Sequence, residues 1–387
     1  MDRHASTRAV FTLAIVLCAS VAARGQGVRS DQGGPAPPTP PNPSLGELQG
    51  SAAQCAIQCT VFQYEMVARQ ARGLLATDTG FSQNVLSPVL DAQPPGTSGI
   101  TQMANWNDDG GVVVRGQNAP MIPSRWQVWA NAYDVGGSVA ETDMLGSLDH
   151  TAAGAQLGVF RLLDSGSVLG VFSGFAHQDV DMLLDQKTGD IDSGQLGVVL
   201  RTADVSDYSL FASAVAYDAY QVGRQAARSE FDGSQASAYF ERGCCIPVGA
   251  MSLGPSLAIQ YTWLHQEDFV ETLGAPNLTF AAKNTNSLRS TIGSRLTCGR
   301  HTTWGHVTPE LRAHWMHEYL DCKTSVAMTA VAAAPSISTG VNMGRDWAVL
   351  GAGLNLELGC DVCLFAAYDL QLNERATYHV ACCGMQW

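Results

Sequence analysis

The sequence has few charged residues and, beyond its N-terminus, no long hydrophobic run. Charged side chains make up 15% of its 387 residues, compared with about 25% in typical soluble proteins. A membrane-spanning helix needs about 18 uninterrupted apolar residues, and no segment after residue 23 approaches that length. The composition therefore argues against helical membrane spans and suits strands that contact lipid on one side and water on the other.

Basic residues are also scarce. Lys and Arg number 22 against 35 Asp and Glu, which gives a net charge of −13. Nucleic-acid backbones bind basic surfaces, so this charge argues against a nucleic-acid partner. Residues 24–124 contain no histidine, and Ser165 and Ser234 lie in turn-like places without a Gly-x-Ser-x-Gly elbow. We therefore expect no catalytic residues and no enzyme activity.

The histidines, cysteines and acidic residues do not form a complete metal-binding motif. His314 and His317 are three positions apart, so in a strand they face opposite sides and cannot bind one ion. Zinc binding by Cys360 and Cys363 is possible but less favoured. Calcium binding by the acidic stretch 179–192 is less favoured because its spacing is not that of a known calcium loop. We expect polar or solvated side chains there, and no metal or cofactor.

The N-terminus has the order of a secretory signal peptide. Arg3 and Arg8 precede an apolar run from Ala9 to Val21, and small residues allow cleavage after Ala23. The run is too short to span a bilayer as a helix. We expect residues 1–23 to be a signal peptide and the mature chain to leave the cytoplasm.

Two further segments precede the strands. Residues 24–50 are rich in Pro and Gly, which predicts an extended linker. Residues 51–124 form a short N-terminal region that is either passenger-like or a plug. Apolar spacing predicts a helix over 51–76, whereas turn residues and prolines predict an irregular segment over 77–124.

Residues 251–266 have the clearest strand pattern. Successive side chains of a strand point to opposite faces, and here the even positions are small or polar. The odd positions are apolar, and we expect them to contact lipid: Met251, Leu253, Pro255, Leu257, Ile259, Tyr261 and Trp263. Aromatic residues near strand ends are interpreted as membrane-interface belts: Trp126, Trp129, Tyr133, Trp263, Trp315 and Tyr319.

Twelve segments of this kind follow from Trp126 to the end of the chain. Their expected bounds are 126–136, 152–163, 167–177, 191–203, 207–220, 233–244, 250–266, 286–298, 304–318, 345–358, 361–371 and 376–387. Long connections after odd-numbered strands, such as 178–190 and 319–344, alternate with short ones, and only the last connection departs from this rule. The alternation is typical of outer-membrane barrels. It predicts an all-β fold, a twelve-stranded antiparallel transmembrane β-barrel, after a short, partly helical or irregular N-terminal region.

Charged residues share one face of the eighth and ninth segments, opposite the apolar side chains. If the apolar faces look outward, these charges line the lumen, where water makes them far less costly than in a dry protein core. The lumen-facing polar candidates are Arg289, Arg295, Glu310, Arg312 and His314.

Together these residues resemble the autotransporter β-domain family of type V secretion. The resemblance rests on the Trp-rich first strand 126–129, the spaced glycines from Gly154 to Gly174, and the stretches 261–271, 288–295 and 309–318, and it covers residues 125–387. It implies a twelve-stranded outer-membrane barrel that anchors, and helps to export, an N-terminal passenger. The implied partners are outer-membrane lipid and the barrel-assembly machinery, with Trp387 as the C-terminal insertion signal.

Two features depart from the family pattern. The family threads a helix through the pore directly before the first strand, whereas residues 110–124 contain Gly110, Gly111, Pro120 and Pro123. The region before the barrel is also short for a passenger. The ligand of such a passenger is not identified by the sequence.

The expected function is thus anchoring and translocation of a short N-terminal passenger at the outer membrane. The cell surface is one possible location of this N-terminal region. The alternative is a passive porin-like or structural barrel whose N-terminal region stays in the periplasm or plugs the pore. A secreted soluble enzyme with an all-β fold is a third class.

One cysteine pair gives a sharper structural hypothesis. A hairpin centred near Leu372 and Asn373 would bring Cys363 and Cys382 nearly opposite each other on the lumen face. Such neighbours can form a cross-strand disulfide, so this pairing is a possible disulfide.

Overall fold

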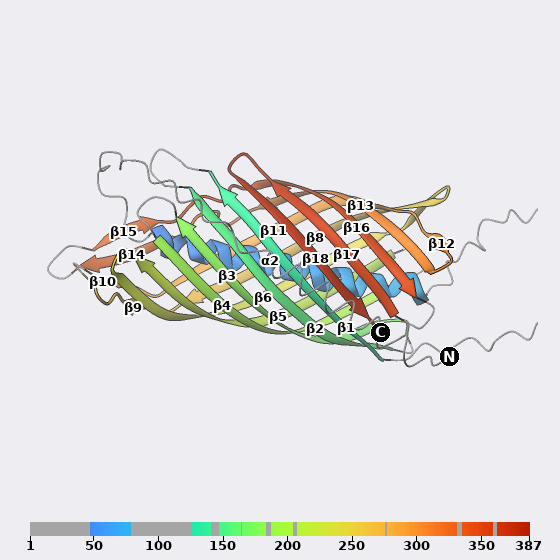
Figure 1. Ribbon diagram of the computed structural model, residues 1–387, viewed down its shortest axis with the longest axis horizontal. Coiled ribbons are helices and arrows are strands. Elements are labelled where there is room, and N and C mark those ends of the chain that lie inside the picture. Colours follow the sequence, from blue (N-terminus) through green and yellow to red (C-terminus); the bar gives the residue numbers. More distant parts are fainter. Residues whose placement is uncertain are drawn as a thin grey trace, which may run out of the picture. The chain divides into compact units, whose positions relative to one another are not determined.

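The computed structural model describes residues 47–78, 126–140, 147–163, 165–182, 187–203, 207–274, 277–330, 335–358 and 362–387. Twelve long strands form an antiparallel barrel (Figure 1). They are β1 (Trp126–Val139), β2 (Leu148–Leu162), β3 (Val168–Met182), β4 (Lys187–Ala203), β5 (Asp207–Arg224), β6 (Ala227–Cys244), β8 (Met251–Gln266), β11 (Lys283–Thr297), β13 (Gly305–Glu318), β16 (Asp346–Leu358), β17 (Val362–Leu372) and β18 (Ala376–Gln386). The predicted fold class is confirmed.

The barrel closes between its first and last strands. β1 pairs with β18 along eleven residues, from Trp129 opposite Gln386 to Val139 opposite Ala376. Beyond this ladder, Val128 and Trp387 exchange two backbone hydrogen bonds of 2.8 and 2.9 Å. Closure leaves no unpaired strand edge in the barrel wall, which is the condition for a sheet to lie in hydrocarbon.

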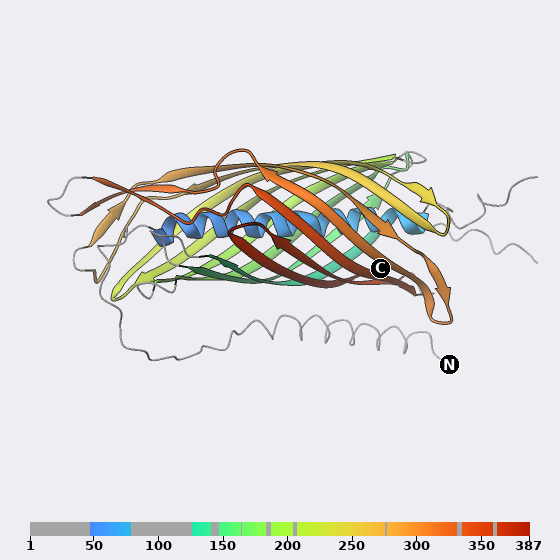
Figure 2. The same cartoon turned by 90° about the horizontal axis from the view of Figure 1, so that it is seen from above.

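Six short strands lie outside the twelve. β7 (Ile246–Val248) and β12 (Arg300–Thr302) extend two hairpins. A separate four-stranded sheet contains β9 (Phe269–Val270), β10 (Leu278–Phe280), β14 (Ser325–Ala330) and β15 (Ser336–Thr339). This cap sheet is built from the connections 267–282 and 319–345 (Figure 2). We call that end of the barrel the long-loop end, and the opposite end, which holds the connection 163–167, the short-turn end.

The connections differ from the predicted alternation. Residues 178–190, expected to be a loop, belong mostly to β3 and β4, and β5 and β6 are joined by a turn of only residues 225–226. Val180, Met182 and Ile191 remain buried on the inner face, while the aspartates between them are exposed. The outward aspartates suggested a loop, but they continue the strand alternation.

The outer wall carries the apolar face predicted for residues 251–266. Leu257 is 50% exposed and Ile259 48% exposed, so no described element of the chain covers them. Other exposed apolar side chains continue this face around the barrel: Leu157, Leu196, Val215, Ile292, Leu311, Leu350 and Leu354. Of the expected belt residues, Trp126 and Trp315 face outward, but Trp129 and Tyr133 are fully buried on the inner face.

Inward aromatic rings of the barrel lie against glycines of neighbouring strands. A Cβ on Gly158 would come within 2.5 Å of the Trp129 indole, and one on Gly154 within 2.4 Å of the Tyr133 ring. These glycines therefore make room for large rings inside a narrow barrel. Gly170 lies in the same way against the Phe160 ring, whereas Gly174 lies against the side chains of Gln156 and Gln195.

The helix α2 (Glu47–Asp78) begins four residues before the predicted helix, and its residues through Ala71 belong to the same compact unit as the barrel. Figure 2 shows this helix along the barrel interior. Between Glu47 and Ala71 every residue is buried except Glu65 and Arg69, which are half-buried. Its many alanines and glutamines suit a helix that contacts both polar and apolar side chains of the surrounding wall. Among the described residues, no helix has the length and hydropathy of a membrane span.

Candidate functional site

The candidate functional site is the barrel lumen, which α2 occupies. At the long-loop end, the Lys187 ammonium lies 3.1 Å from the Glu47 carboxylate, and both side chains are 3% exposed. Gln54 donates hydrogen bonds to the backbone oxygen of Asp321 at 3.1 Å and to the Thr324 hydroxyl at 2.8 Å. The first two turns of the helix are thereby fixed to β4 and to the connection that carries the cap sheet.

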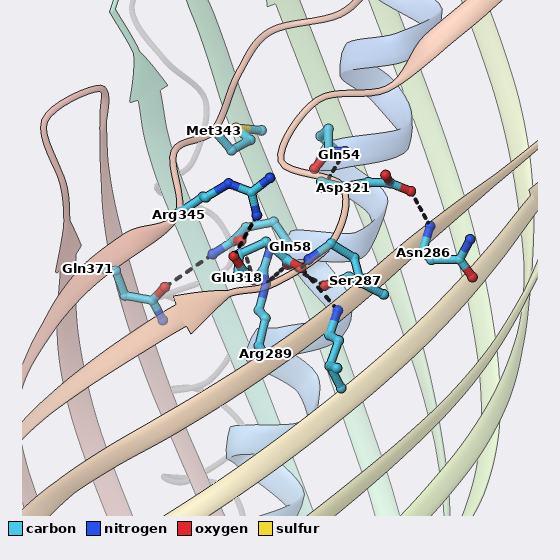
Figure 3. A network of polar contacts seen from close by, with 12 residues as sticks. Gln54, Gln58, Asn286, Ser287, Arg289, Glu318, Asp321, Met343, Arg345 and Gln371 are labelled. Carbon is cyan, nitrogen blue, oxygen red and sulfur yellow. Dashed lines mark hydrogen bonds and ion pairs between the residues drawn. The ribbon is translucent and has the colours of Figure 1, made fainter.

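A second set of contacts holds the middle of the helix (Figure 3). Arg289 Nε donates to Glu318 at 2.8 Å, and its Nη1 donates to the Gln58 amide oxygen at 2.7 Å. The Gln58 amide nitrogen in turn donates to Gln371 at 3.1 Å. All four side chains are buried. Each therefore depends on the others for hydrogen bonds that water would otherwise supply.

A third polar cluster lies nearer the short-turn end. Arg312 Nη2 donates to Asp369 at 2.6 Å and Arg312 Nη1 to Glu310 at 2.5 Å. Arg69 of α2 reaches the other oxygen of Asp369 at 3.1 Å. Two arginines and two carboxylates thus neutralise one another between helix and wall. Beyond this cluster, Arg201 Nη1 donates to the Ala71 carbonyl at 3.3 Å.

The structure places all five predicted polar candidates on the inner face, but in separate groups. Arg289 lies in the middle cluster, and Glu310 and Arg312 lie together in the third. Arg295 lies over the Tyr208 ring at 5.3 Å, and the His314 ring lies against Gly293. The predicted lumen position is thus observed, with Arg289 contacting α2 and Arg312 pairing with both Glu310 and Asp369.

Several partners in the lumen were missed from the sequence. Asp369 has the same strand parity as Cys363, which the sequence placed on the lumen face, so the alternation pattern was a usable signal for it. For Gln58 and Arg69 there was no such signal, because a helical segment shows no sign of which surface will enclose it. The fully buried Asp218, which accepts hydrogen bonds of 2.6 Å from both Ser193 and Gln235, was likewise missed.

Apolar packing accompanies these polar contacts toward the long-loop end of the lumen. Leu48, Ile57 and Phe62 of α2 join one buried cluster with wall residues of both barrel halves, including Val180, Ile191, Leu264 and Trp347. An aromatic stack continues from this cluster into the cap sheet. Its ring centroids are 4.7 Å apart for Tyr220 and Phe231, 4.1 Å for Phe231 and Phe269, and 4.7 Å for Phe269 and Phe280. Helix, wall and cap thus share continuous packing.

The predicted disulfide between Cys363 and Cys382 is wrong. Cys363 lies opposite Gln386, Cys382 lies opposite Ala367, and both thiols are free. The turn explains the difference, because the Asn373 side-chain oxygen accepts hydrogen bonds from the amides of Arg375 and Ala376, each at 2.7 Å. This capped turn centres the hairpin two residues beyond the predicted position and shifts every pair by four.

The two histidines weighed as metal ligands face opposite sides of β13. His314 lies inside the barrel, and His317 lies outside, where its Nδ1 is 2.8 Å from Asp346. Of the cysteine pair, Cys360 is outside the described residues. Within the described parts of the chain, no three His, Cys, Asp or Glu side chains are grouped to hold a metal ion.

A closed twelve-stranded barrel with a lipid-facing exterior and an enclosed helix defines an outer-membrane barrel of the translocator type. The family model of the autotransporter beta-domain matches residues 128–369, so the chain belongs to that family. It is accordingly a protein of the Gram-negative outer membrane, in which the barrel acts as anchor and translocator. The alternative of a passive porin-like barrel is not favoured.

Solved structures similar to the chain are translocator domains. The domain of the autotransporter NalP from Neisseria meningitidis superposes with a TM-score of 0.55 at 15% identity, covering 68% of this chain and 88% of that one. The β-domain of the Bordetella autotransporter BrkA gives 0.54 at 16%, covering 68% and 99%. The transport unit of AIDA-I from Escherichia coli gives 0.52 at 12%, covering 69% and 92%. At these identities the similarity establishes the fold.

A curated relative is the extracellular serine protease of Serratia marcescens. It is 24% identical over 162 residues, which make up 41% of this chain and only 15% of that protein. The match covers too little of the protease to carry its activity to this chain.

Proposed function

We propose that this barrel translocates the N-terminal part of its own chain and afterwards retains α2 as a plug. The single observation that carries the proposal is the burial of α2 from Glu47 to Ala71, with contacts to the wall along its whole length. A chain that has been threaded through the barrel and then arrested would leave a helix in the lumen. Such a helix would contact the wall at both ends, as α2 does.

The threaded chain acts here as cargo and anchor, without catalysis of its own. The absence of histidine from residues 24–124 supports this, since a Ser-His nucleophile would need one. The match to the serine protease named above covers only 15% of that protease, so it gives no support for protease chemistry in this chain.

Barrel-assembly machinery is the partner we propose for membrane insertion. The support is the position of Trp387, whose backbone completes the β1–β18 closure by pairing with Val128. A signal directly after the last strand would be accessible to that machinery before β1 and β18 pair.

Surface labelling of intact cells tests the translocation. A FLAG epitope inserted after Asp31 is expected to bind antibody on intact cells that contain a heat-modifiable, folded barrel. Detection only after permeabilisation, with the barrel still folded, would refute translocation. Removal of residues 47–71 tests the plug, since it is expected to raise single-channel conductance in planar bilayers above that of the full chain.

A further inference from the structure

The two ends of the buried helix segment lie at opposite ends of the barrel. Glu47 pairs with Lys187, the first residue of β4, beside the long-loop end. The Ala71 carbonyl accepts from Arg201, which lies two residues before the end of the same strand, at the short-turn end. The chain before Glu47 therefore leaves the barrel at the long-loop end, and the chain after Ala71 leaves it at the short-turn end.

The first barrel strand begins at that same short-turn end. Trp126 is paired with Arg161, near the end of β2 and beside the connection 163–167. Both attachment points of residues 72–125, a stretch of 54 positions, therefore lie on one side of the barrel.

The packed lumen prevents this stretch from crossing to the other side and returning. Such a crossing would place two more passes of chain beside α2. The helix is buried from Glu47 to Ala71, and its side chains contact the surrounding wall directly. Protein interiors are close-packed, so a lumen filled in this way has no space for two further segments.

The side of the membrane follows from the two ends of the barrel. Outer-membrane barrels keep short turns in the periplasm and longer loops outside. The largest connections, 267–282 and 319–345, lie at the long-loop end with the cap sheet. The outward aspartates of the β3–β4 hairpin, Asp179, Asp181, Asp190 and Asp192, also lie toward that end, beyond the apolar band.

We propose that the outer membrane divides the region before the barrel into two parts: the chain preceding Glu47 is at the cell surface, and residues 72–125 stay in the periplasm. The inference rests on the proposed translocation and identifies its cargo. The barrel exports only the chain before α2, while the later segment is available to periplasmic partners.

One epitope inserted at four positions tests the division. The FLAG sequence is placed in separate full-length variants after Asp31, after Ser98, between Gln225 and Ala226, and between Ser165 and Gly166. The last two are matched controls, because they lie in described turns at the long-loop and short-turn ends. Antibody binding is compared on intact and on permeabilised cells, with heat-modifiability as the test of folding.

We expect the epitopes after Asp31 and Gln225 to bind on intact cells, and those after Ser98 and Ser165 only after permeabilisation. Binding after Ser98 on intact cells, with Ser165 still hidden, would overturn the division but leave translocation standing. A hidden Asp31 epitope beside an exposed Gln225 epitope would instead refute translocation. Should the Ser98 insertion prevent folding, intact cells that carry the unmodified chain are treated with proteinase K instead. The proposal requires that residues 79–125 remain uncut, and cleavage within them would overturn it.

Discussion

Lys187 and Glu47 form an ion pair of 3.1 Å in which both side chains are 97% buried. The pair joins the wall strand β4 to the first residue of α2. Two charges removed from water to this extent stabilise each other, because each replaces part of the solvation that water would supply. The pair is therefore a sensitive point for the attachment of the helix.

Replacing Lys187 with Met should destabilise the folded, helix-filled barrel. Breaking a buried ion pair by removing one partner typically costs about 3–5 kcal/mol. The midpoint of urea unfolding in lipid vesicles measures the loss. Arg242→Met is the matched control, because its pair with Asp207 at 3.4 Å is solvent-exposed and should contribute about 1 kcal/mol or less. Equal effects of the two substitutions would contradict the burial of the Lys187 pair.

Arg289 should be coupled to Gln58 of the helix. Arg289→Met removes the donor to Glu318 and to Gln58, and Gln58→Leu removes one acceptor of the same arginine. Because the residues share one network, the double variant should lose less stability than the sum of the single losses, with a coupling of about 0.5–3 kcal/mol. Strict additivity in urea unfolding would indicate that the helix does not contact Arg289.

Gly158 should tolerate no side chain while Trp129 is present. A Cβ at Gly158 would lie 2.5 Å from the indole, so Gly158→Ala should cost about 1–3 kcal/mol and slow the appearance of the heat-modifiable form. Gly194→Ala is the control, since a Cβ there has no neighbour within 4 Å. Adding Trp129→Ala to Gly158→Ala should restore part of the folding rate. A Gly158→Ala barrel that folds as fast as Gly194→Ala would refute the close packing.

The cap sheet should loosen when Phe269 is shortened. Phe269 lies between Phe231 and Phe280, and replacing a packed Phe with Ala costs about 3 kcal/mol. Hydrogen exchange in β10 and β14 should accelerate, while exchange in the barrel strands changes little. Val270→Ala serves as the control because Val270 is 57% exposed. Unchanged exchange in Phe269→Ala would show that the stack does not hold the cap.

Cys363 and Cys382 should both react with an alkylating reagent after unfolding without reductant. Their register places them opposite Gln386 and Ala367, so no cross-strand bond joins them. Peptide mass spectrometry of the unreduced protein measures this. A disulfide-linked peptide that contains both cysteines would contradict the register set by Asn373.

The sequence alone determined the features that depend on alternation along one strand. The period of two in residues 251–266 identified the lipid-facing side chains, and the same parity placed Arg289 and Arg312 inside. Twelve segments with this pattern were sufficient for the barrel and for its family. Local alternation is readable because each residue's face follows from that of its immediate neighbour.

Tertiary structure decided everything that depends on distant segments. Only the assembled barrel shows that α2 enters the lumen, that Glu47 meets Lys187 at one end, and that Ala71 meets Arg201 at the other. Likewise, Trp129 was assigned to an outer belt because its inner neighbour, Gly158, is not adjacent in the chain. Such contacts join residues far apart in the sequence, so the residue pattern within one segment does not predict them.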